Sequence, residues 1–207
     1  EYTKYYSLYK IFTPDVQNAL VIGGGAYSIP KALIAELPNA MIDVSEIEPS
    51  LFDLSKQYFD VEDNPNLNNY TEDGRRLLRD SDKKYDLIFS DVYYSLFSIP
   101  AHFTTQEFFT IAKEKLSDDG VFIANLIGDL SRQKPSLIFA EIKTFQSVFP
   151  NSYFFAIETP EKTDSQNIIF VGYNSEKKID LSTASILQNS NPVINSLRNK
   201  VININRY

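Results

Sequence analysis

The chain has 207 residues, a length typical of one domain, and 43% of them are hydrophobic, enough to form a buried core. Its net charge of −7, without a dense stripe of lysine or arginine, argues against DNA or RNA binding, which needs a basic face. Cysteine is absent and His102 is the single histidine, so disulfides, a cysteine nucleophile, zinc–thiolate sites and multi-histidine metal sites are excluded.

Nothing in the sequence predicts a membrane span or a secretory signal. No run of about 18 apolar residues occurs, and the first residues have no signal-peptide pattern. The lack of cysteine fits a reducing compartment, so we expect a cytoplasmic location. The chain begins at Glu1 without methionine, which favours a piece of a longer protein.

The first half of the chain alternates apolar runs with amphipathic segments. Apolar residues at helical spacing predict an entry helix over residues 2–12. Ser28 is the expected N-cap of the helix after the first strand, with Pro30 in its first turn. The expected strands are 18–23, 40–48 and a weaker 67–70, and the helices that follow them are 28–37, 49–59 and 71–80.

The second half continues the alternation and then changes character. We expect strands at 85–93, 121–128, 152–158 and 167–173, helices at 104–116 and 135–149, and a turn at 118–120. The alternation predicts an α/β fold, a mostly parallel sheet with helices on both faces. The last two strands have no helix between them and predict an antiparallel edge. Residues 1–174 are therefore the expected domain, and the polar segment 175–207 an appendage.

Three consecutive glycines, Gly23, Gly24 and Gly25, follow the first strand. Ligands of open α/β sheets bind beyond the carboxyl ends of the strands, and glycines there let backbone N–H groups approach a ligand closely. A tight turn without a ligand is the alternative. The order GGGAYS differs from G-x-G-x-x-G, so a nucleoside ligand is favoured over a dinucleotide.

Acidic residues follow the next two strands. Glu46 ends the second strand, where a carboxylate can accept both ribose hydroxyls. Glu48 lies one strand period further, but it also suits the start of a helix. Asp73 follows the third strand, where an adenine amino group would lie if Glu46 holds the ribose. Its alternative role is a helix N-terminal carboxylate.

Asp91 ends the fourth strand and precedes an aromatic loop that begins with Tyr93 and Tyr94. A carboxylate beneath such a loop can accept a proton or hold an amine, and the two tyrosines can act as a substrate lid. His102 could act as a base, but a lone histidine in a loop is more often structural. After the fifth strand, Asn125 and Asp129 could line the same cleft or face solvent.

The motifs LVIGGG, SEIEP, EDGRRLL and YDLIFSDVYYSLFSIPAHFTTQEFF, in this order, resemble the polyamine aminopropyltransferases, the spermidine synthase family. The resemblance covers residues 1–173 and is nearest to the spermidine synthase-like domains that microbes often fuse to membrane segments. It implies a Rossmann-like S-adenosylmethionine-dependent methyltransferase fold with seven strands, and a homodimer. It also leaves open membrane segments elsewhere in the full-length protein.

The resemblance also implies a transferase of polyamine biosynthesis. Its co-substrate would be decarboxylated S-adenosylmethionine, and it would transfer aminopropyl to an amine such as putrescine without a metal. By position, Asp91 matches the family's catalytic aspartate, Glu46 its ribose carboxylate, and Asp73 its adenine contact. Gly23, Gly24 and Gly25 match its glycine turn.

Two motif positions depart from the family. The family reads GGGDGG where this chain has Ala26 as the fourth residue, so the carboxylate that holds the aminopropyl amine is absent. The family also reads D-x-x-D-P where this chain has Tyr94 in place of the second aspartate. Three interpretations stay open: an aminopropyltransferase, an S-adenosylmethionine-dependent methyltransferase-like domain, and a non-catalytic nucleoside-binding domain of a membrane protein.

Overall fold

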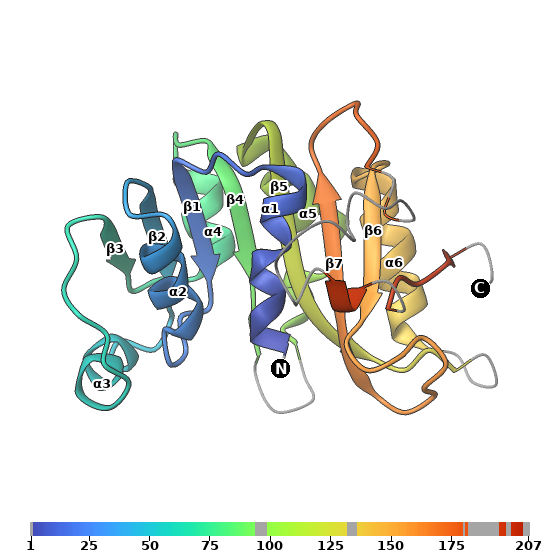
Figure 1. Cartoon of the computed structure of the whole chain (residues 1–207), viewed down its shortest axis with the longest axis horizontal. Helices are drawn as coiled ribbons and strands as arrows, with labels where there is room; N and C mark the ends of the chain where they lie inside the picture. Colours follow the sequence, from blue (N-terminus) through green and yellow to red (C-terminus); the bar gives the residue numbers. More distant parts are fainter. Residues whose placement is uncertain are drawn as a thin grey trace.

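A seven-stranded sheet with the order β3-β2-β1-β4-β5-β7-β6 carries the fold (Figure 1). The computed structural model describes residues 2–93, 99–131, 136–179, 181, 195–197 and 200–204. The strands are β1 (Asn18–Ile22), β2 (Met41–Ser45), β3 (Leu67–Tyr70), β4 (Tyr85–Ser90), β5 (Leu116–Gly128), β6 (Ser152–Ala156) and β7 (Gln166–Tyr173). The helices are η1 (Tyr2–Leu8), α1 (Tyr9–Phe12), α2 (Ser28–Glu36), α3 (Leu51–Tyr58), α4 (Gly74–Asp80), η2 (Ala101–Phe103), α5 (Gln106–Lys115) and α6 (Leu137–Val148).

The pairing of the strands confirms the predicted mixed sheet. β3, β2, β1, β4 and β5 are parallel, whereas β7 pairs antiparallel with both β5 and β6. β7 is the last strand in the sequence, yet it lies between β5 and β6. The strand order reverses between β1 and β4, which is where open α/β sheets bind their ligands.

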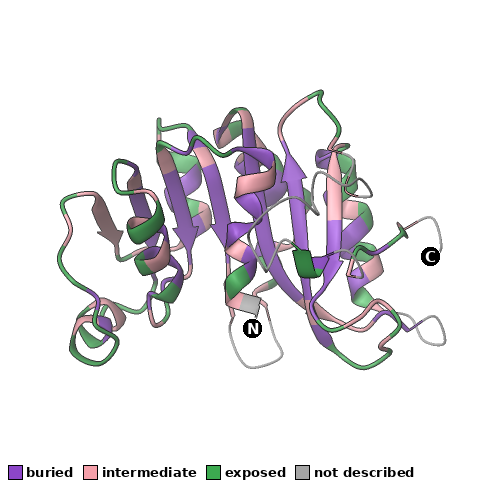
Figure 2. Ribbon diagram, viewed as in Figure 1, coloured by how far each residue is buried: buried purple, intermediate pink, exposed green. Residues whose placement is uncertain are grey.

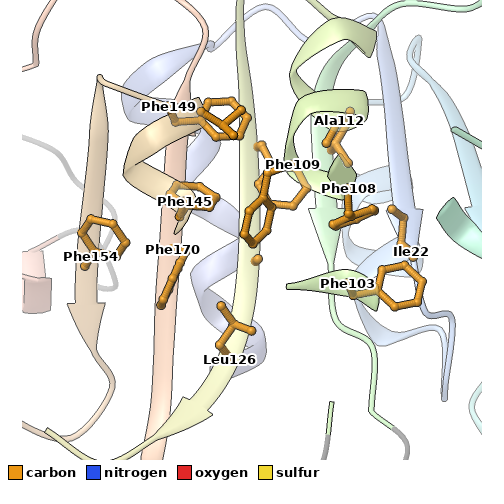
Figure 3. Packing of buried hydrophobic residues seen from close by; sticks show 14 of the residues in the cluster. Ile22, Phe103, Phe108, Phe109, Ala112, Leu126, Phe145, Phe149, Phe154 and Phe170 are labelled. Carbon is orange, nitrogen blue, oxygen red and sulfur yellow. The ribbon is translucent and has the colours of Figure 1, made fainter. Parts of the chain in front are cut away.

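Two hydrophobic cores form, one on each face of the sheet, and Figure 2 shows how thoroughly the central strands are buried. Helices α4, α5 and α6 cover one face, whose core is rich in phenylalanine (Figure 3). Phe145 of α6 lies at its centre, with its ring 4.9 Å from Phe109 and 5.3 Å from Phe170. The other face is covered by η1, α1 and α2. Helices on both faces were predicted and are confirmed.

Three local predictions are wrong. Tyr27 rather than Ser28 occupies the N-cap of α2, at φ +57°, because its N–H closes a tight turn onto the Gly24 carbonyl. β2 ends at Ser45 because the Glu46 carboxylate turns back and accepts the Glu48 N–H, so the two glutamates do not alternate along a strand. The expected turn at 118–120 is instead part of β5, although Asp119 keeps φ +59° there.

The described part of the polar tail packs against the sheet. Val201 forms a β-bridge with Phe155, and the Ile202 N–H donates to the Phe154 carbonyl. Leu197 and Ile202 are buried. The boundary of the domain at residue 174 stays a prediction. In the part of the chain that the structure describes, no helix has the length and apolar character needed to cross a membrane.

Candidate functional site

A cavity of about 730 Å³ opens at the carboxyl edge of β1, β2, β3 and β4. It brings together most of the residues singled out in the sequence, which are Gly23, Gly24, Gly25, Glu46, Asp73, Asp91 and Tyr93. Tyr94 lies outside the described residues. Glu48, Pro100 and His102 also line the cavity, as does Thr3 of η1. The topology therefore gathers segments that lie up to a hundred residues apart, because parallel strands end at one edge.

The protein's own packing accounts for two of the three glycines. Gly23 has φ +90°, and a Cβ atom there would lie 2.4 Å from the carbonyl oxygen of Asp91. A Cβ atom on Gly24 would lie 2.6 Å from the Tyr27 ring. Gly25, at φ +51°, would place a Cβ atom in open space. The close approach predicted for a ligand is thus made at Gly23 by the end of β4 and at Gly24 by a buried tyrosine.

Tyr27 was missed as a site residue. Its ring is fully buried 5.2 Å from Phe52, and its hydroxyl donates to Asn69 Oδ1. Burial, and then the negative charge of Glu46, raises the pKa of this hydroxyl well above its usual range. Tyr27 therefore forms a neutral floor beneath the glycine turn. No local signal in the sequence pointed to this role.

Glu46 is buried behind the glycine turn. Its Oε2 accepts the N–H groups of Gly24 and Gly25, each at 2.9 Å, and its Oε1 accepts the Glu48 N–H at 2.9 Å. The carboxylate thus fixes the turn by backbone hydrogen bonds, and it also lines the cavity. Glu48 instead accepts the hydroxyl of Ser50, which lowers the pKa of its carboxyl, so the structure favours its helix-start role.

Asp73 serves as the N-cap of α4, where Oδ1 accepts the Arg76 N–H at 3.0 Å. Its Oδ2 lies 3.2 Å from Nε2 of His102, which η2 brings across the cavity. Asp73 therefore does serve as a helix N-terminal carboxylate, and it also lines the cavity. His102 contacts Asp73 rather than Asp91, so its position does not support the base role considered for it.

Asp91 directly follows β4 and is held by a side chain of β5. Asn125 Nδ2 donates to Asp91 Oδ1 at 3.0 Å, and Asn125 Oδ1 accepts from Asn167 Nδ2 at 3.0 Å. Tyr93 joins this network, because its hydroxyl donates to the Asn125 carbonyl at 3.3 Å. Asn125 was considered as a residue that lines the cleft, but it lies behind Asp91 and not in the cavity lining, and Asn167 was missed. Asp129 accepts the Ser131 N–H in a local turn and does not line the cavity.

The charge of the cavity lining is one-sided. Its carboxylates are Glu46, Glu48, Glu72, Asp73 and Asp91, and no lysine or arginine occurs among the described lining residues. A cleft of this kind attracts cations and repels ligands that carry their own carboxylate. Within the described residues, no group of three or more metal-ligating side chains forms.

Known proteins are similar to this chain in sequence. A family described as the spermine/spermidine synthase domain matches residues 7–183. A polyamine aminopropyltransferase of Vibrio vulnificus is 31% identical over 162 residues, which are 77% of this chain and 52% of that protein. An N-terminal histidine N-methyltransferase of Emericella nidulans is 35% identical over 143 residues, 67% of this chain and 24% of that protein. The chain thus spans about half of the first relative and a quarter of the second.

The fold is also found among solved structures. Human methyltransferase-like protein 13 in complex with SAH matches with a TM-score of 0.69 and 24% identity, over 92% of this chain and 83% of that chain. At this identity the likeness speaks for the fold alone. It confirms the predicted S-adenosylmethionine-dependent methyltransferase-like architecture.

Proposed function

The chain belongs to the spermine/spermidine synthase family, and from that premise we propose that this domain transfers an aminopropyl group from decarboxylated S-adenosylmethionine to a small-molecule amine such as putrescine. The family's relatives include transferases of aminopropyl and of methyl groups. The choice between these two co-substrates is therefore the first question that the cleft has to answer.

The acidic lining of the cleft carries the proposal. Decarboxylated S-adenosylmethionine combines a sulfonium with an ammonium group and has no carboxylate, so it suits a wall of carboxylates. S-adenosylmethionine keeps a carboxylate, which would need a cation or uncommitted N–H donors. The described lining offers no lysine or arginine, and the N–H groups of Gly24 and Gly25 already bind Glu46.

We assign the nucleoside to one half of the cleft, made by Gly23–Gly25, Glu46 and Asp73, and call it the nucleoside half. Glu46 would accept the ribose hydroxyls, and Asp73 the adenine amino group. Both carboxylates line the cavity, Glu46 directly after β2 and Asp73 between β3 and α4. The hydrogen bonds that they now make to the glycine turn and to His102 hold them in place before the ligand binds.

The other half, which we call the amine half, has Asp91 and Tyr93 on the cavity wall, with Asn125 and Asn167 behind Asp91. In the proposed reaction the lone pair of the acceptor nitrogen attacks the aminopropyl carbon next to sulfur. The C–S bond breaks with its electron pair on sulfur, which leaves neutral methylthioadenosine. Asp91 accepts the proton that the new ammonium group must lose. Its main contribution is to orient a neutral amine in line with the C–S bond.

Methyl transfer is the second candidate, and one observation favours it. Ala26 lines the cavity where the family's motif carries the carboxylate that holds the aminopropyl amine. Without that carboxylate, repulsion of a ligand that keeps its own carboxylate is weaker. The similarity to an N-terminal histidine N-methyltransferase extends the same argument. We keep the homodimer, the cytoplasmic location and any membrane segments of the full-length protein as further expectations.

Calorimetric binding of the two co-substrates side by side tests the proposal. We expect decarboxylated S-adenosylmethionine to bind at least about tenfold more tightly, a difference of about 1.4 kcal/mol. Tighter binding of S-adenosylmethionine would replace aminopropyl transfer by methyl transfer. Binding of neither would favour a non-catalytic domain. Ala26→Asp is the matched variant, because a restored carboxylate should increase the preference for the decarboxylated form.

A further inference from the structure

Two asparagines interrupt an apolar face of the sheet behind Asp91. On β5, Val121 and Ile123 point into the core shared with η1, α1 and α2, and Asn125 follows on the same face. On β7, Ile169 belongs to the same core, and Asn167 lies two residues before it. Because alternate residues of a strand share a face, both amides continue apolar rows at the carboxyl edge. Asn125 is only 2% exposed, so its amide costs stability unless it is hydrogen-bonded.

The hydrogen bonds at both ends of the Asn125 amide determine its orientation. Its NH₂ group faces Asp91 Oδ1 at 3.0 Å, and its oxygen faces the Asn167 NH₂ group at 3.0 Å. Rotating the amide by half a turn would set an oxygen against the Asp91 carboxylate and one NH₂ group against another. Both contacts would be repulsive, because an amide oxygen only accepts and an NH₂ group only donates. Asn167 therefore helps to decide which atom Asn125 presents to Asp91.

We propose that Asn125 and Asn167 are positioning residues, in which Asn167 fixes the Asn125 amide so that it always donates to Asp91 Oδ1 and holds that carboxylate ionised and aimed into the cleft. The proposal rests on the proposed function only in the use that it gives to Asp91. Hydrogen bonds from N–H donors favour the ionised form of a carboxylate, and an ionised Asp91 is the form able to accept a proton.

Tyr93 ties the network to the segment of Asp91 itself. Its hydroxyl donates to the Asn125 carbonyl at 3.3 Å and lies 3.4 Å from Asn167 Nδ2. Among the described residues, the other titratable groups that share the cavity with Asp91 are Glu46 behind the glycine turn, Glu48, Glu72, and Asp73 with His102. Substitutions at Asn167 leave all of these groups unchanged, and Asn167→Ala adds no charge of its own, so its effect on Asp91 reports on the amide chain.

The decisive variant is Asn167→Asp, which preserves size and shape but replaces the donor by an acceptor. In either orientation, Asn125 would then set its oxygen against one of two carboxylates. Asn167→Ala only removes the constraint. We expect kcat to fall about fiftyfold in Asn167→Asp and about fivefold in Asn167→Ala, with the KM for the sulfonium co-substrate unchanged. A purely structural role for Asn167 predicts the opposite order, because the aspartate packs better than alanine.

A readout without turnover separates this inference from the proposed function. In ¹³C-carboxyl-labelled protein, the resonance of Asp91, assigned with Asp91→Asn, should titrate at higher pH in both Asn167→Ala and Asn167→Asp than in wild type. Asn174→Asp is the matched control. Asn174 follows the other end of β7 and donates to the Ser117 carbonyl at 2.9 Å, so it should shift neither kcat nor this titration.

Each outcome of the titration and kcat measurements either supports or overturns the inference. An Asp91 titration that shifts to higher pH in both Asn167→Ala and Asn167→Asp, but not in Asn174→Asp, supports the positioning chain, even if wild type transfers no aminopropyl group, in which case the proposed function alone fails. A shift in Asn167→Asp alone would be direct repulsion between two carboxylates and would overturn the inference. An unshifted titration overturns the inference, whatever the turnover. Equal losses of kcat in Asn167→Asp and Asn174→Asp would also overturn it, since they would reduce Asn167 to a packing residue.

Discussion

The two halves of the cleft are built in different ways. The nucleoside half consists of residues that directly follow β1, β2 and β3, and its hydrogen bonds run largely to backbone N–H groups. The amine half consists of side chains from β5, β7 and the segment after β4, and it is held by bonds between side chains. A ligand site made of strand ends is a property of the topology, whereas a fixed base depends on particular side chains. The two halves should therefore respond separately to substitution.

Asp91→Asn separates the two halves most strongly. The amide cannot accept the proton of the new ammonium group, so we expect turnover to fall by about 10²- to 10⁴-fold. The affinity for methylthioadenosine should stay within about twofold, because the nucleoside half is untouched. Steady-state kinetics and calorimetry on the same preparation measure both. A parallel loss of nucleoside affinity would show that the halves are one unit.

Gly23→Ala tests the contact between the two halves, where the glycine turn meets the end of β4. Its Cβ atom would lie 2.4 Å from the Asp91 carbonyl oxygen, at φ +90°. Strain and the forced movement of β4 should lower the free energy of unfolding by about 3 kcal/mol or more. Gly25→Ala is the matched control, because its Cβ atom meets nothing within 4 Å. It should cost about 1 kcal/mol, the penalty of a left-handed backbone alone. Equal losses in urea unfolding would remove the packing explanation for Gly23.

Glu141 tests the helix layer behind the amine half. It belongs to α6, which packs on β5, the strand that carries Asn125. Burial raises the pKa of its carboxyl from 4.5 to about 7, while a hydrogen bond from Thr104 opposes this shift. The Glu141 carboxyl ionises at lower pH in the unfolded chain than in the folded protein. Its contribution to the free energy of unfolding should therefore be fully present below pH 4.5 and be lost as pH rises through 7. Glu141→Gln should therefore stabilise the protein by on the order of 2 kcal/mol at pH 8 and have little effect at pH 4. Parallel stability–pH curves for the two proteins would contradict this assignment.

Glu46→Gln tests the ribose contact assigned to the nucleoside half, and its expected effect is the smallest of the four. An amide offers one acceptor oxygen to the ribose instead of a charged pair, so methylthioadenosine should bind about tenfold more weakly. The 2′-deoxy analogue of this ligand is the control, because it lacks one of the hydroxyls assigned to Glu46. Wild type should discriminate between the two ligands, and the variant should discriminate less. Unchanged discrimination would move the ribose away from Glu46.

The fold and the gathering of Gly23–Gly25, Glu46 and Asp73 around one cavity could be predicted from sequence because their signals are local. Apolar runs and glycines mark β1 and its turn, and carboxylates such as Glu46 and Asp73 stand directly after strands. Strand ends were less predictable, since the side chain of Glu46, rather than any propensity, ends β2. The roles of Asn167 and Tyr27 had no local signal. Asn167 contacts a residue 42 positions away across an antiparallel pair, and Tyr27 is buried where the family's GGGDGG motif has glycine.

The place of β7 in the sheet also sets the order in which the site can be completed on the ribosome. Gly23, Glu46, Asp73 and Asp91 leave the ribosome well before Asn167, and synthesis of the intervening residues takes on the order of ten seconds. Until then β5 lacks its neighbour on the side away from β4, because β7 inserts beside it only after β6 has been made. A nascent domain therefore assembles the parts of its nucleoside half first. The hydrogen-bonded chain behind Asp91 is the last feature to be completed, because Asn167 belongs to the last strand to be made.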